Sequence, residues 1–158
     1  MKAFAGESQA NRRYLAFAAK AEKEGKANIA RFFRAIAEAE TIHALKHLEV
    51  AGGVASTQDN LAQAIEGEKH EYTEMYPEFI AVAKEEDQKQ ALRSLEYANE
   101  AEKVHGRIFA QLKARVDANE DASDEAIILC KVCGWVGQGA MPERCPICNS
   151  TSQVMVKF

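Results

Sequence analysis

A length of 158 residues, with 47% hydrophobic and 28% charged side chains, fits one main globular domain with a small appendage. The formal net charge of −4 gives no reason to expect a nucleic-acid partner. No apolar run reaches the ~20 residues of a membrane helix, and the amino-terminal stretch has no secretory hydrophobic region. We therefore expect a cytoplasmic protein without a membrane partner.

Helices are expected throughout the first three quarters of the chain. Residues 1–118 are rich in Ala, Glu, Lys, Leu and Arg and contain one proline, Pro77. Ser56 or Thr57 can cap the third helix, and Asp87 with Gln90 three residues later resembles a capping box for the fourth. Amphipathic periodicity and the glycine positions predict four helices, over residues 2–24, 27–51, 57–86 and 87–118.

A second, smaller module is expected at the carboxyl end. Residues 119–126, NEDASDEA, are acidic, lack large apolar groups and are typical of a linker. From Ile127 onward Cys, Gly and Pro occur together and the helical periodicity ends. The sequence thus predicts a helical domain over 1–118 and a small module with short β-strands over 127–158.

The helical region repeats itself. AGESQANRRY is echoed by EGEKHEYTEMY, which puts Glu7 and Glu68 in matching places. AETIHA is echoed by AEKVHG, so two Glu-x-x-His pairs also match: Glu40 with His43, and Glu102 with His105. The first two and the last two helices therefore look like copies of one hairpin.

Each predicted helix interrupts its apolar stripe with carboxylate. In the second helix Ile29, Phe33 and Ile36 lead to Glu40 and then His43 on the same face. Acidic or imidazole side chains occupy the corresponding stripes of the other helices at Glu7, Glu68, Glu71, Glu102 and His105. Solvated surface positions would be the ordinary explanation for glutamate, but all four helices show the same interruption. Burying five carboxylates without counter-charge is prohibitive.

Two bound dications would resolve this conflict. One Glu from each of two helices, with a Glu-x-x-His from each of the other two, is the ligand set of ferritin-like di-iron carboxylate bundles. The predicted set is Glu7, Glu40, His43, Glu68, Glu102 and His105.

Glu71 stands outside the repeat. It follows Glu68 by one turn, where the first repeat has Ala10. It is either a solvated carboxylate or one that contacts a metal ligand without binding the metal, or it is a seventh ligand that distinguishes the two metal positions. Tyr14 and Tyr76, about two turns beyond Glu7 and Glu68, either hydrogen-bond a ligand carboxylate or pack in the core.

The carboxyl-terminal module carries all the cysteines of the chain. CKVCGW and CPIC supply two Cys-x-x-Cys pairs, at Cys130, Cys133, Cys145 and Cys148. Four thiolates make a closed tetrahedral site for zinc or iron. The spacing alone favours structural zinc, whereas a di-metal site on the same chain favours iron, because a redox-active oxygen-ligand site needs an electron source.

The motifs FAGESQA, ETIH, GEKHEYTEMYP and AEKVH, followed by CKVCG and CPIC, resemble rubrerythrin over nearly the whole chain. The resemblance implies a ferritin-like bundle with a non-haem di-iron site and a rubredoxin-like domain holding one iron on four thiolates. It implies a peroxidase that reduces hydrogen peroxide to water. Electrons would pass from NAD(P)H through a reductase, or through rubredoxin, to the iron-thiolate centre and then to the di-iron pair. It makes Glu71 a ligand as well, which one iron exchanges for His43 when the oxidation state changes.

Two other functions compete with the peroxidase: ferroxidase or iron storage in a ferritin-like shell, and a zinc-loaded structural role. The four-cysteine module argues against storage, because a storage shell needs no attached electron carrier.

The short link between the second and third helices predicts the assembly. Closing a bundle within one chain needs nearly ~30 Å, whereas seven residues, 51–57, extend to ~25 Å at most. With the family resemblance, this predicts a homodimer in which the two hairpins are exchanged between chains.

Overall fold

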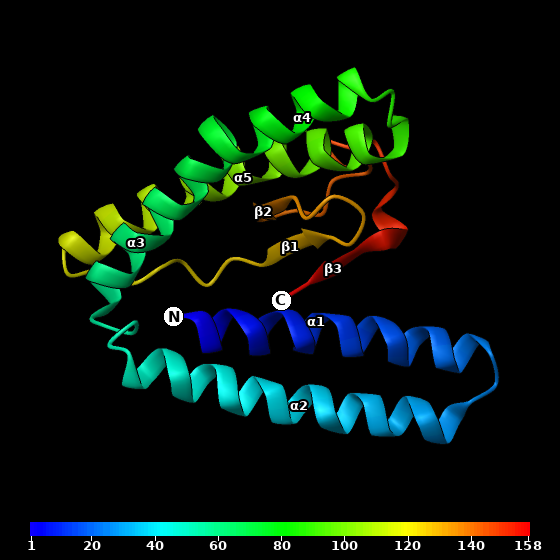
Figure 1. Cartoon of the computed structure of the whole chain (residues 1–158). Coiled ribbons are helices and arrows are strands. Elements are labelled where there is room, and N and C mark those ends of the chain that lie inside the picture. The colour runs from blue at the N-terminus through cyan, green and yellow to red at the C-terminus, as the bar shows by residue number, and fades with distance from the viewer. The chain divides into compact units, whose positions relative to one another are not determined.

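The computed structural model describes residues 1–158 and divides the chain into two compact units, Met1–Ala55 and Ser56–Phe158. The first unit is a hairpin of α1 (Lys2–Lys23) and α2 (Ala27–Val50), seen in Figure 1 in blue and cyan. Gly25, with φ of +72°, ends α1 in the left-handed conformation that a residue with a side chain resists. Both helices therefore have the predicted extent.

Small side chains hold this hairpin together. Ala18, Ala30 and Ala37 are almost completely buried, which lets the two helix backbones approach closely. Beside them the rings of Phe17 and Phe33 meet edge to face, with centroids 5.7 Å apart.

The second unit begins with a long helical segment that contains an irregularity. α3 (Thr57–His70) is capped by Ser56, whose Oγ accepts from the Asp59 backbone N–H at 3.1 Å. It is followed without a break by a π-helical turn, η1 (Glu71–Met75), and by α4 (Tyr76–Glu85). The predicted helix over 57–86 is therefore confirmed in extent, but its π-turn was not predicted.

Two sequence features explain the π-turn. The Tyr76 N–H bonds to the Glu71 carbonyl, five residues back instead of four. Pro77 lacks an N–H, and its ring would clash with the carbonyl of an α-helical turn, so a wider turn relieves it. The repeat offset also changes here, from 61 between Glu7 and Glu68 to 62 between Tyr14 and Tyr76. The third helix thus holds one residue more than the first.

The fourth predicted helix starts slightly later than expected. α5 runs over Lys89–Asp117, with Gln88 as its N-cap and no side-chain capping bond. The predicted capping box at Asp87 is wrong: Asp87 has φ of +50° and belongs to the turn that ends α4. Aspartate tolerates that left-handed conformation better than most residues, which explains its presence.

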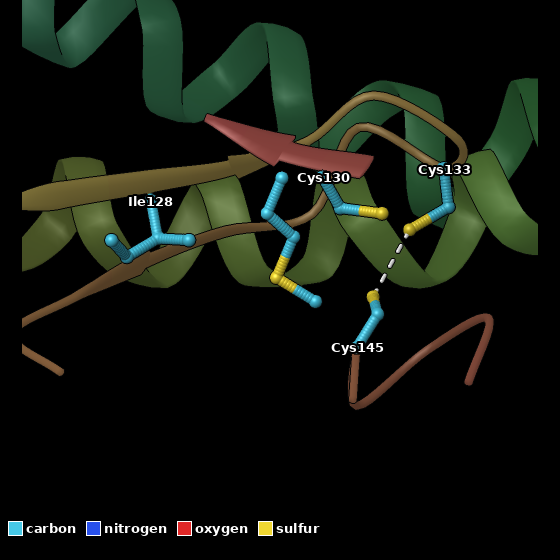
Figure 2. Packing of buried hydrophobic residues seen from close by; sticks show 5 residues of the cluster. Ile128, Cys130, Cys133 and Cys145 are labelled. Carbon is cyan, nitrogen blue, oxygen red and sulfur yellow. Dashed lines mark hydrogen bonds between the residues drawn. The ribbon is translucent and has the colours of Figure 1, made fainter. Parts of the chain in front are cut away.

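The carboxyl-terminal module is a small antiparallel sheet. β1 (Ile127–Cys130) lies between β2 (Val136–Gln138) and β3 (Met155–Lys157), and a 3₁₀ turn, η2 (Ser152–Val154), precedes β3. Its core consists of Ile128, Met155 and the buried cysteines (Figure 2). Tyr97 of α5 packs against this core, so the module rests on the helix.

The predicted class, mainly helical with a four-cysteine module of short strands, is confirmed. Residues 120–126 have no regular structure, as expected for the predicted linker. The two compact units meet at Ala55 and Ser56, so the domain boundaries at 118 and 126 stay a prediction. None of the helices has the length and apolar character needed to cross a membrane.

Candidate metal centres

The four cysteines converge as the sequence predicts. Cys130 is the last residue of β1 and Cys133 lies in the turn that follows it, whereas Cys145 and Cys148 flank a second tight turn. The Sγ atoms of Cys133 and Cys145 lie 3.4 Å apart, and those of Cys130 and Cys148 lie 3.6 Å apart. A disulfide would bring two sulfurs to ~2.05 Å, whereas tetrahedral ligands at ~2.3 Å from a metal stand ~3.8 Å apart. The spacing fits a tetrahedral metal site.

The electrostatics of the thiols agree with this fit. Burial raises the pKa of Cys133 and of Cys145, because a thiolate without a partner is costly there. Burial also opposes ionisation of Cys148, but hydrogen bonding with the side chain and backbone of Ser150, together with Cys145 and Cys130, outweighs it and lowers its pKa to about 7. A cation at the centre would compensate the charge of the other thiolates.

The first unit carries one cluster of possible metal ligands. Glu7 of α1 and Glu40 and His43 of α2 each offer one ligand atom, and these atoms lie within 4.8 Å of one another. His43 Nδ1 is 3.2 Å from Glu40 Oε2. The Glu40 side chain is 16% exposed, whereas His43 is 56% exposed. The hairpin alone therefore presents half of the predicted ligand set, with its imidazole facing outward.

A buried amide fixes the register of this hairpin. Asn11 follows Glu7 by one turn, and its Nδ2 donates to the Ala37 carbonyl at 2.7 Å and to Thr41 Oγ1 at 2.8 Å. Because Thr41 is next to Glu40, these bonds also set the height of Glu40 relative to Glu7. Asn11 was not among the predicted site residues, although it lies in the repeated segment between Glu7 and Tyr14.

We predict that Asn11→Ala lowers the free energy of unfolding of the iron-loaded protein by about 1–3 kcal/mol, since one buried and one partly buried hydrogen bond are lost. The measurement is denaturant unfolding followed by circular dichroism. Gln9→Ala is the matched control, because it removes an exposed amide from the same helix and should change the value by less than about 0.5 kcal/mol. Equal effects of the two substitutions would show that the amide bridge contributes nothing.

The second unit carries a matching cluster between α3 and α5. Glu68, Glu102 and His105 bring one ligand atom each within 4.8 Å of the others. His105 Nδ1 lies 2.6 Å from Glu102 Oε2 and 3.7 Å from Glu68 Oε2. The two Glu-x-x-His pairs thus take equivalent positions in the two units.

The negative charge of the second cluster favours a bound cation. Burial, followed by the hydrogen bond and charge of Glu102, raises the pKa of Glu68 to about 7. Glu68 Oε2 is also buried without a hydrogen-bond partner. A metal ion bound to Oε2 would satisfy this atom and offset the repulsion between the carboxylates, so these residues fit a metal ion.

Glu71 and Tyr76 lie beside this cluster. Glu71 opens the π-turn, and its ligand atoms are not among those gathered within 4.8 Å. Burial and then the charge of Glu102 raise the pKa of both Glu71 and Tyr76, so both side chains sense the cluster. The role of Glu71 as a ligand stays a prediction.

His105 also touches the four-cysteine module, a contact that the sequence did not predict. Its Nε2 donates to the Gly134 carbonyl at 3.0 Å, and Gly134 follows Cys133 directly. This hydrogen bond places the ring proton on Nε2 and leaves Nδ1, the atom facing Glu102, to bind metal. One imidazole therefore connects the carboxylate cluster with the cysteine turn.

Comparison with known proteins agrees with both centres. The rubrerythrin family model matches residues 1–113. The chain is 39% identical to Rubrerythrin-2 of Clostridium acetobutylicum, over 93% of this chain and 88% of that one. It is 36% identical to a rubrerythrin of Nitratidesulfovibrio vulgaris, over 94% and 86% of the two chains.

The chain belongs to the rubrerythrin family. A nigerythrin structure in its fully reduced, all-ferrous state is similar as well, with 33% identity and a TM-score of 0.61 over 99% of this chain and 83% of that one. Family, fold and ligand clusters together support iron as the cofactor and an oxidoreductase role for this rubrerythrin.

Proposed function

We propose that this rubrerythrin is a non-haem di-iron peroxidase that reduces hydrogen peroxide to water, with electrons supplied through its four-cysteine iron centre. The observation that carries the proposal is the double contact of His105, with Glu102 through Nδ1 and with Gly134 of the cysteine turn through Nε2. An oxygen-ligand metal site connected to a thiolate centre by one side chain is suited to receiving electrons.

The reaction balances with two electrons. Each peroxide takes up two electrons and two protons, its O–O bond breaks, and two water molecules form. Two iron ions would polarise the peroxide oxygens and supply the electron pair. The chain's own residues would hold those ions through Glu7, Glu40, His43, Glu68, Glu71, Glu102 and His105.

Tyr76 is suited to assist near the site. Burial and the neighbouring carboxylates raise its pKa, so its hydroxyl stays protonated at neutral pH. A protonated hydroxyl beside Glu102 can donate a hydrogen bond to that carboxylate and orient it. We therefore propose Tyr76 as a positioning residue.

Electrons would arrive one at a time at Cys130, Cys133, Cys145 and Cys148. We propose that they come from NAD(P)H through a separate reductase, directly or through rubredoxin. The covalent and hydrogen-bonded route from Cys133 through Gly134 to His105 lies within one unit of the chain. Four unpaired cysteines are compatible with a reducing cytoplasm.

The proposed di-iron site would take its ligands from both units, because each unit carries one Glu and one Glu-x-x-His pair. We propose that a homodimer completes it by exchanging hairpins. Ile29 and Ile36, on the same stripe of α2 as Glu40, are 51% and 45% exposed, an apolar face that needs a covering surface.

Anaerobic peroxide titration of the chemically reduced, iron-loaded protein tests the function. We expect each peroxide to remove two electrons from the protein and to restore the thiolate-to-iron absorption that reduction bleaches. Metal analysis comes first, because zinc at either site would abolish the colour change. If the protein instead oxidises and retains added ferrous iron with oxygen while peroxide is consumed no faster than by free iron, ferroxidase or storage activity replaces the proposal.

A further inference from the structure

A cleft opens beside the four-cysteine centre, where the amino-terminal half of α5 meets the turn after β1. Its volume is about 610 Å³. Both walls belong to the second unit, in which the small sheet rests on α5 (Figure 1). The cleft is lined by Lys89, Gln90, Arg93, Ser94, Tyr97 and Val132.

The lining is cationic although the whole chain is acidic. Two cations, Lys89 and Arg93, line the cleft, and no carboxylate does, in a chain of net charge −4. Arg93 lies over the Tyr97 ring, 5.8 Å from its centroid, and no carboxylate stands within ion-pair distance of it. Lys89 reaches Asp87 only at 3.9 Å between two strongly exposed side chains, a pair of little strength.

The opposite wall brings an apolar side chain to the surface at the metal centre. Val132 is 52% exposed and stands between Lys131 and Cys133, two residues after Cys130. A partner that touches Val132 is therefore one residue away from a cysteine of the centre. An apolar contact surrounded by cations is the arrangement of a transient, electrostatically steered interface.

We propose that this cleft docks an acidic protein domain that carries a one-electron redox centre, with Val132 at the middle of the contact and Lys89 and Arg93 at its rim. The inference rests on the proposed function and assigns the surface at which its electron donor would bind. In each encounter the donor centre loses one electron and the four-cysteine iron gains it. Two encounters supply the two electrons for one peroxide.

The electron count argues against a nicotinamide nucleotide as the direct occupant. A single iron on four thiolates accepts one electron, whereas a nicotinamide gives up two electrons as a hydride. The cationic lining favours an anionic surface, and complementary charge raises association rates by about 10-fold to 1,000-fold at low ionic strength. A protein donor with an acidic face satisfies both conditions.

Stopped-flow reduction of the four-cysteine iron by a reduced acidic rubredoxin tests the site in the full-length, iron-loaded protein. For the unaltered protein we expect the second-order rate constant to fall at least about tenfold between low and high salt. The double variant Lys89→Glu with Arg93→Glu should be at least about tenfold slower at low salt and should lose most of the salt dependence.

A control variant and a second electron donor make the outcome decisive. Lys23→Glu with Arg31→Glu changes the net charge equally on exposed positions of α1 and α2 and should leave the rate unchanged. Equal slowing by both double variants would reduce the effect to net charge and overturn the site. Efficient reduction by NADH alone, abolished by Lys89→Glu with Arg93→Glu, would make the cleft a nucleotide site instead.

Peroxide oxidation of dithionite-reduced protein separates this inference from the proposed function. If that reaction proceeds while charge reversal leaves rubredoxin reduction unchanged, the docking site is wrong and the peroxidase stands. If peroxide does not oxidise the reduced protein at all, the proposed function fails, whatever rubredoxin does.

Discussion

Replacing Cys145 by serine is expected to lower peroxide turnover with NAD(P)H and a reductase by about 100-fold or more. Residues that merely orient a metal ligand already contribute about 10- to 100-fold, and Cys145 is proposed to bind the iron itself. Its side chain is 3% exposed, and its Sγ lies 3.4 Å from that of Cys133, so no solvent ligand can easily replace it. Steady-state peroxide consumption measures the loss.

The same variant should keep one half of the reaction. Chemically reduced Cys145→Ser protein should still be oxidised by peroxide, because the cluster of Glu68, Glu102 and His105 contains no cysteine. Met141→Ser is the control, since it removes an exposed sulfur from the same module without touching the four thiols. Undiminished turnover in Cys145→Ser would make the four-cysteine centre a structural element for which zinc suffices.

The ligand clusters were predictable because they depend on local periodicity. Residues three apart on a helix share a face, so Glu40 with His43 and Glu102 with His105 had to point together. The repeat then paired each of them with the glutamate of a neighbouring helix, and the structure gathers Glu7 and Glu68 accordingly. The four-cysteine site was predictable from its two Cys-x-x-Cys pairs, because that spacing is typical of a metal site.

The contacts that the sequence did not predict depend on packing between distant segments or on small backbone adjustments. The bond from His105 to Gly134 joins residues 29 positions apart and requires the small sheet to rest on α5. The π-turn had two visible indications, Pro77 and the change of repeat offset, but neither distinguishes a wide turn from a kink. Asp87 has the composition of a capping residue and the backbone conformation of a turn.

Mixing two inactive variants is expected to restore activity if the hairpins are exchanged between chains. α2 ends at Val50 and α3 begins at Thr57, which leaves residues 51–56 to connect them. If the two helices run parallel in one bundle, the chain must return ~10 Å from Val50 to the level of His43 and ~16 Å from Thr57 to that of Glu68. With ~10 Å between helices, the span approaches ~30 Å, whereas the connection extends to ~25 Å. Exchange removes the shortfall.

The experiment combines Glu40→Ala with Glu102→Ala, unfolds both proteins and refolds them together with iron. In an exchanged heterodimer one site takes Glu40→Ala from the first hairpin of one chain and Glu102→Ala from the second hairpin of the other. The remaining site has neither defect. Random pairing makes half of the dimers mixed, so about a quarter of the normal peroxide activity should return.

The control places both defects in one hairpin. A mixture of Glu7→Ala and Glu40→Ala should stay inactive, because every site of an exchanged dimer then contains one altered first hairpin, whichever chain provides it. In a dimer without exchange, each site takes all its ligands from one chain, and neither mixture regains activity. Recovery only in the mixture of Glu40→Ala with Glu102→Ala would therefore assign Glu7, Glu40 and His43 to one chain of each site, and Glu68, Glu102 and His105 to its partner.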